Sequence, residues 1–422
     1  MFKHPVYKAF LVSIGIALLI FIFGLFPALV QKYYSTAVYP YISSSLRLIS
    51  AIFPFALCDI IYAVLICFVL YKIIRFIKKR KTLNREHRIV VPVQILNFFL
   101  ILYIIFKLVW GLNYSRPSTS KELGIGNEKY TVKELVSLGD YFVEKTNNLK
   151  RKQEEKNVHS IAFLEKNSAY AYLLMEKKNS LFKYSNPCLK SVLIPWIVSK
   201  VGIEGYYAPL SGEANMNMNL PDFVKPYVSC HEIAHQLGIA YEDEANLLGY
   251  LTASNSPDVN YQYSANYEML RYILFEIRMN SPDDYKLLHD RLSPAVLADF
   301  KTEKEFWRKY NGEMFAYMDA AFDRFLKLNN QKKGIDSYQD IVIWLWNIHK
   351  NELKLKIKSA RARHPNAQPV THNFYLKLAT CNLLPMYCFS RPKALNQFTF
   401  KFQPFFPAFI YININGIFTG EV

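Results

Sequence analysis

This sequence of 422 residues lacks the short cysteine motifs of metal and disulfide sites and the glycine-rich motifs of phosphate-binding loops. None of its six cysteines forms a Cys-x-x-Cys pair, so the spacing predicts no disulfide framework. The sequence also lacks an internal repeat and a glycine-rich phosphate-binding loop. Acidic residues are scarce, with 34 Asp and Glu against 51 Lys and Arg, and the net charge is +17. Because no nucleic-acid-binding module accompanies this charge, we expect no nucleic acid partner and assign the excess to membrane-flanking residues and a basic tail.

Apolar residues make up 51% of the chain, and three long apolar runs stand in its first quarter. The runs Ala9–Val30, Phe53–Ile74 and Ile89–Trp110 are each long enough to cross a hydrocarbon core of ~30 Å. They predict a membrane anchor over residues 1–110, with the lipid bilayer as a partner. Pro54 indicates that the second span begins later than the apolar run itself, which makes Asp59 an interfacial residue.

Basic residues are concentrated between the second and third runs, at Lys78, Lys79, Arg80, Lys81, Arg85 and Arg88. The loop after the first run holds only Lys32 and Arg47. The positive-inside rule therefore predicts a multi-pass protein with a cytoplasmic N-terminus and an extracytoplasmic domain after Trp110. In a two-membrane bacterium, we expect such a protein in the inner membrane, with this domain in the periplasm.

The strongest chemical signal is the HExxH motif of residues 231–235. On a helix, His231 and His235 share one face, so both imidazoles reach a single metal ion. Glu232 is placed to orient and deprotonate a metal-bound water as general base. Pro226 suits the first turn of this helix, and Gly238 suits its left-handed C-terminal cap.

A catalytic zinc site needs a third protein ligand and leaves one position open. A second helix is predicted to begin near Glu242, and a carboxylate in its first turn would point back at the histidines. Both Glu242 and Glu244 lie in that turn. The residues alone leave the choice between them open, and we favour Glu242 with Glu244 as the alternative.

The combination of HExxH with a following glutamate resembles the gluzincins, a class of zinc peptidases. The resemblance implies that Glu242 is the third ligand, that Asn246 hydrogen-bonds a ligand imidazole, and that an edge strand beside the zinc helix binds an extended peptide. It makes residues 214–220 the candidate for that strand. The spacing departs from thermolysin-like enzymes, because only six residues separate His235 from Glu242.

A second resemblance covers about residues 10–355. It rests on FPFALCDIIY, WGLNYSRP, GYYAPLSGEANMN, CHEIAHQLGIAYEDEAN and GIDSY, which begin at residues 53, 110, 205, 230 and 334. Together they resemble a bacterial membrane family catalogued as domain of unknown function 3810. The resemblance implies a membrane-anchored zincin-like domain and supplies no substrate.

The predicted fold is mainly α, of the α+β type: three N-terminal transmembrane helices precede a mostly helical, zincin-like soluble domain over residues 111–358. Capping signatures at Thr131-x-x-Glu134 and Thr302-x-x-Glu305 mark two helix starts. A small β-sheet is expected within residues 190–220, where Asn and Met alternate. Residues 359–422 are a basic C-terminal extension for which we expect disorder or an unusual fold.

The function predicted from these features is a zinc metallopeptidase of the HExxH-plus-Glu type, with Zn²⁺ as cofactor and a peptide or protein as substrate. An oxyanion partner is also needed, and Tyr261, Tyr263 and His289 are unranked candidates. The alternatives are a catalytically inactive, zinc-stabilised membrane sensor or assembly protein, and a membrane protein without metal.

Overall fold

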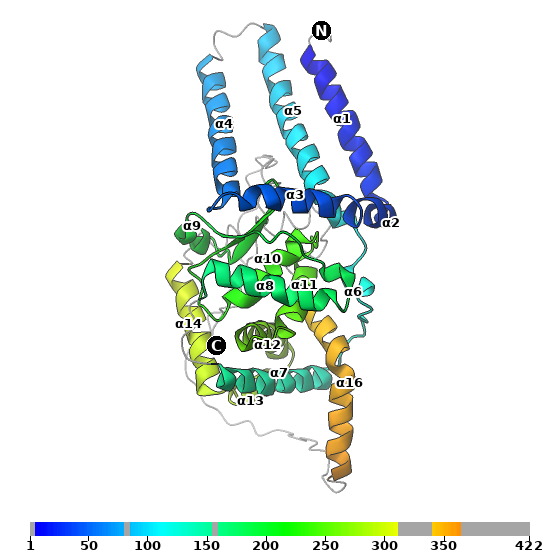
Figure 1. Ribbon diagram of the computed structural model, residues 1–422, viewed down its shortest axis with the longest axis vertical. Coiled ribbons are helices and arrows are strands. Elements are labelled where there is room, and N and C mark those ends of the chain that lie inside the picture. Colours follow the sequence, from blue (N-terminus) through cyan, green and yellow to red (C-terminus); the bar gives the residue numbers. More distant parts are fainter. Residues whose placement is uncertain (1–4, 80–84, 154–158, 311–339, 364–422) are drawn as a thin grey trace, which may run out of the picture.

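The computed structural model describes residues 5–79, 85–153, 159–310 and 340–363. Three long helices extend side by side from one end of a helical body, and α3 lies across their inner ends (Figure 1). The predicted class is confirmed, since helices dominate and a single three-stranded sheet occurs among the described residues. Residues 364–422, which include almost all of the predicted C-terminal extension, lie outside the described ranges.

The long helices are α1 (Pro5–Gly24), α4 (Leu57–Lys79) and α5 (Arg85–Val109). Each is long and apolar enough to span a membrane, over Pro5–Gly24, Leu57–Lys78 and Ile89–Val109 respectively. The second span begins after Pro54, as predicted. The first ends before the predicted residue 30, because Pro27 opens a new helix and its ring nitrogen has no hydrogen to donate to the preceding turn.

Between the first two spans the chain runs along the inner ends of the long helices. It forms α2 (Pro27–Leu29), the π-helix η1 (Val30–Ser35) and α3 (Tyr39–Ala51). After α5, the short helices η2 (Gly111–Ser115) and α6 (Thr119–Glu122) lead into the body.

The sheet has the order β1-β3-β2, with β1 (Leu189–Ser191) parallel and β2 (Gly205–Ala208) antiparallel to β3 (Glu213–Met216). Gly205 pairs with Met216 and Tyr207 with Ala214. The predicted edge strand at residues 214–220 is therefore wrong in two respects. The strand ends at Met216, and it is the central strand, because a three-residue segment at Leu189 pairs along its other side.

Most of the remaining helices form the body beneath the sheet, while α9 lies level with the sheet near the inner end of α4 (Figure 1). These helices are α7 (Val132–Lys152), α8 (Ile161–Glu176), η3 (Ser180–Phe182), α9 (Pro195–Lys200), α10 (Lys225–Gln236), α11 (Glu242–Ser254), α12 (Val259–Asn280), α13 (Pro282–His289), α14 (Pro294–Tyr310) and α16 (Asp340–Arg363). The capping box at Thr131 and Glu134 is confirmed. The predicted helix start at Thr302 is wrong, because Thr302 lies inside α14.

Buried contacts run across the boundary predicted at residue 110. One apolar cluster joins Tyr39 and Trp110 of the anchor to Tyr207 of the sheet and Ala240 of the body. Another joins Cys58 and Tyr62 of α4 to the sheet through residues such as Tyr206. The inner ends of the spans and the helical body therefore share their core.

Candidate metal centre

Helix α10 carries the HExxH motif and has clear signals at both ends. Pro226 occupies its first turn, as predicted. At the other end Gly238 has a φ of +82°, its N–H donates to His235 O, and the N–H of Ile239 donates to Ala234 O. This pair of bonds is a Schellman motif, which needs a residue tolerant of the left-handed region. It turns the chain directly into α11.

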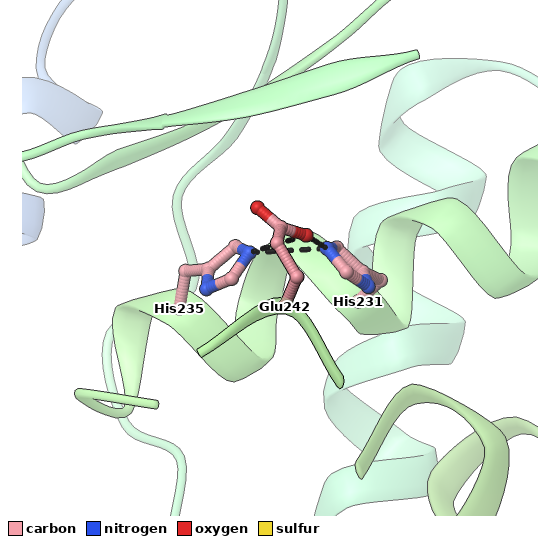
Figure 2. A group of neighbouring side chains, drawn as sticks. All are labelled: His231, His235 and Glu242. Carbon is pink, nitrogen blue, oxygen red and sulfur yellow. Dashed lines mark hydrogen bonds and ion pairs between the residues drawn. The ribbon is translucent and has the colours of Figure 1, made fainter. Parts of the chain in front are cut away.

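Three side chains from these two helices meet at one point (Figure 2). The Nε2 atoms of His231 and His235 are 3.0 Å apart, and Glu242 Oε2 lies 3.3 Å from the first and 4.0 Å from the second. All three residues are fully buried. Among the described residues, this is the group whose donor atoms are close enough to hold a metal ion.

The ring of His235 is held in the orientation a metal ligand requires. Its Nδ1 lies 2.6 Å from the carbonyl oxygen of Ile239. A carbonyl can only accept, so Nδ1 carries the proton and Nε2 presents its lone pair to the cluster. Burial, and then the neighbouring His231, lower the pKa of His235 well below its usual value. The ring is therefore neutral, as metal binding demands.

Glu242 and Glu244 point in different directions, although both lie in the first turn of α11. Glu242 reaches between the two imidazoles (Figure 2). Glu244 instead accepts hydrogen bonds of 2.7 Å from both the backbone N–H and the hydroxyl of Thr119. Two helical residues two positions apart differ by about 200° in direction, so only one of them can face the histidines. The geometry places Glu242 there.

The close crossing of α10 and α11 depends on Gly249. A Cβ at this position would lie 3.3 Å from the backbone N and Cα of His231 and from the Tyr227 ring. Because the glycine has no side chain, α11 approaches the helix that carries the ligands closely enough for Glu242 to reach them.

Glu232 lies on the sheet side of α10. A Cβ on Gly205 of β2 would be 2.7 Å from its Oε1 atom and 2.8 Å from its Cγ atom. The side chain therefore packs directly under the edge strand β2, and it is fully buried. This contact was invisible in the sequence, because the two residues are far apart in the chain and belong to different elements.

The three donors could hold a metal ion, and their spacing is compatible with zinc. A tetrahedral site with bonds of about 2.0–2.1 Å separates neighbouring donors by roughly 3.3 Å, close to the distances found here. Two imidazoles and a carboxylate are also a ligand set that zinc accepts and leave a fourth position open. Neither carboxylate oxygen of Glu242 receives a hydrogen bond from the described residues, so a cation would satisfy this buried group.

Asn246 was expected to hydrogen-bond a ligand imidazole, and the oxyanion candidates were expected near the metal site, but all four have other partners. The Asn246 amide accepts from the hydroxyl of Tyr227 at 2.8 Å and donates to Tyr272 at 3.5 Å, with no bond to an imidazole. Tyr261 donates to Leu164 O, Tyr263 donates to Asp299, and His289 lies beside Asp290 on α13. None of these contacts involves the metal cluster.

Tyr272 is a residue that the sequence did not single out. Burial and then the nearby Glu268 raise its pKa well above the usual value, and Glu242 adds to the rise. Its hydroxyl therefore keeps its proton in the electrostatic neighbourhood of Glu242. No sequence motif marks this position, because α12 is buried almost all round and carries several tyrosines.

Residues of the membrane-proximal layer hold the end of α10. Trp110 Nε1 donates to His235 O at 3.2 Å. Gln236 O accepts from Ser43 at 2.7 Å, from Tyr39 at 3.0 Å and from Arg47 at 3.2 Å. A helix end leaves backbone carbonyls without helical partners, so these donors stabilise the turn that carries His235.

Comparison with protein families gives one result for this chain. The family model described as "Protein of unknown function (DUF3810)" matches residues 34–346, which is well over half of the chain and includes the whole metal cluster. No curated protein and no solved structure gives a match. The chain belongs to the DUF3810 family of proteins of unknown function.

Proposed function

We propose that this chain is a membrane-anchored zinc peptidase. The observation that carries the proposal is the buried His231–His235–Glu242 group with Glu232 on the same turn of α10. A structural zinc site is usually closed by four protein ligands, whereas three ligands with a carboxylate beside them suit hydrolysis. The likeness to gluzincins noted from HExxH and Glu242 supports the same reaction class.

In the proposed reaction, His231, His235 and Glu242 would hold zinc, which would polarise the scissile carbonyl and make water more acidic. The carboxylate of Glu232 accepts a proton from the water that attacks the carbonyl carbon, and then passes this proton to the leaving amine. The Ile239 carbonyl keeps His235 in the ligating tautomer. The substrate is a peptide or protein reached from outside the cytoplasm, in the topology that the basic loop predicts.

The full burial of the cluster favours a second candidate, a zinc-stabilised protein without turnover. The two candidates differ in what Glu232 does. Replacing Glu232 by Gln should abolish hydrolysis of a peptide library while equimolar zinc is retained, because the general base is removed and the ligands remain. The matched control is Glu144→Gln on α7, which alters an exposed carboxylate. Equal hydrolysis by wild type and Glu232→Gln, or none by either, would refute the peptidase.

A further inference from the structure

Helix α3 has its polarity reversed relative to a surface helix of a soluble domain. Such a helix normally buries an apolar stripe and exposes polar residues. The residues that α3 buries are Tyr39, Ser43, Arg47 and Ser50. On and beside it, Tyr41 and Ile52 are each 77% exposed, and Leu48, Ile49 and Val38 are about half exposed or more. Apart from Ser45, its outward face is therefore apolar.

A second exposed apolar group surrounds the start of α9. Leu193, Ile194, Trp196 and Ile197 follow one another closely, and Trp196 is 52% exposed. The backbone N–H of Leu193 donates to Asp59 at the beginning of α4, at 2.8 Å. Val192 and Val198 pack against the same end of α4. The group is thus fixed beside the inner end of a predicted span.

Both groups lie where the surface of the spans ends. Figure 1 shows α3 across the inner ends of the three long helices and α9 beside the inner end of α4. The segment up to Cys58, which includes α3, contains no acidic residue, so no carboxylate of this segment opposes contact between α3 and lipid. The ammonium group of Lys200 lies 4.8 Å from the centre of the Trp196 ring. Tryptophan beside a cation is typical of the membrane–water interface.

We propose that α3 and the segment of residues 193–197 lie in the interfacial region of the lipid bilayer, as a contact additional to the three spans. The occupant of these faces is lipid, because they continue the apolar surface of helices that already have the length and composition of spans. The buried side of α3 donates hydrogen bonds from Tyr39 and Ser43 to Gln236 O at the end of α10. Only α3 therefore separates the end of α10 from the proposed lipid surface.

Quenching of tryptophan fluorescence by lipids with brominated acyl chains tests the proposal on the full chain in phosphatidylcholine vesicles. The Trp196 signal is the difference between wild type and Trp196→Phe. We expect that signal to lose most of its intensity when brominated lipid replaces ordinary lipid. Tyr41→Trp in the Trp196→Phe background reports on α3 and should be quenched likewise.

Leu287→Trp in the same background is the matched control, because Leu287 is 64% exposed on α13, at the opposite end of the body. Its emission should be unchanged by bromination. If Trp196 and the tryptophan at position 41 are no more quenched than the one at position 287, water or a second copy of the chain covers these faces, and the proposal is wrong.

Discussion

Glu232 of α10 packs against Gly205 of β2, and this contact fixes the position of the proposed general base. Adding a methyl group at residue 205 would place it 2.7 Å from Glu232 Oε1 and 2.9 Å from Asn215 O, so the carboxylate has to move. A base displaced by about 1 Å loses roughly 100-fold in rate. We therefore expect Gly205→Ala to reduce hydrolysis on that order while zinc content stays unchanged.

Gly15→Ala is the control for this change, since a Cβ at Gly15 meets nothing within 4 Å. Both variants are assayed for peptide cleavage and for bound zinc. Full activity in Gly205→Ala would mean that the position of Glu232 under β2 is unimportant for turnover.

At the scale of single residues, the sequence predicted which metal-binding side chains meet better than it predicted what surrounds them. HExxH identifies His231, Glu232 and His235 because helical spacing brings i and i+4 together. Glu242 and Glu244 were undecided, since their directions depend on how α11 crosses α10 at Gly249. The bonds of Asn246 to Tyr227 and Tyr272 were not predictable either, because they join side chains of three helices.

At the scale of elements, helices with strong local signals and the presence of a small sheet were predicted, but the order of the strands was not. The capping box at Thr131 was found. The similar pattern at Thr302 misled, because Ser293 and Pro294 already begin α14 and Leu297 N bonds to Ser293 O. The central place of β3 depends on Leu189–Ser191, a strand too short to show a period of two.

Helix α16 docks on α7 and α11 through a half-buried histidine. His349 packs against Tyr141 and Phe142, and its Nε2 lies 2.8 Å from the hydroxyl of Tyr250. Burial is the main cause that lowers the pKa of His349 to about 4, with Lys145 adding to it. In the unfolded chain the pKa of histidine is about 6.5. As the pH falls, the unfolded chain therefore protonates His349 before the folded chain does.

This pKa difference predicts a loss of stability on acidification. The contribution of neutral His349 is fully present above about pH 6.5 and is lost as pH falls towards 4, by up to about 3 kcal/mol. The melting temperature of His349→Phe should fall less steeply over this interval than that of wild type. If the melting temperatures of the two proteins fall equally with pH, the neutral form of His349 does not stabilise the fold.

At the scale of the whole molecule, the sequence predicted three spans and a helical body but not how they join. A boundary at residue 110 looks natural from hydropathy alone. The structure instead packs Tyr39 and Trp110 into a cluster with Tyr207 and Ala240. Nothing local in the sequence reports this, because Tyr39 and the carbonyl it bonds at Gln236 are 197 positions apart.

Two tyrosines of α3 separate the role of this junction from that of the lipid-facing surface. Tyr39 is buried with its hydroxyl 3.0 Å from Gln236 O, whereas Tyr41 is 77% exposed. Tyr39→Phe should lower the free energy of unfolding by about 0.5–1.5 kcal/mol, because one hydrogen bond to Gln236 O is lost while Ser43 and Arg47 still donate to it. Tyr41→Phe should change it by less than about 0.5 kcal/mol. Equal unfolding transitions of both variants in the same detergent would contradict the junction described here.

The most direct test of the metal centre is zinc quantitation in the purified full chain and in two matched variants, Glu242→Gln and Glu244→Gln. Glu242 lies beside both imidazoles, while Glu244 is bonded to Thr119. We predict equimolar zinc in wild type and in Glu244→Gln, and a large loss of zinc in Glu242→Gln. Zinc retained by Glu242→Gln and lost from Glu244→Gln, or absent from the wild-type protein, would contradict the centre built from His231, His235 and Glu242.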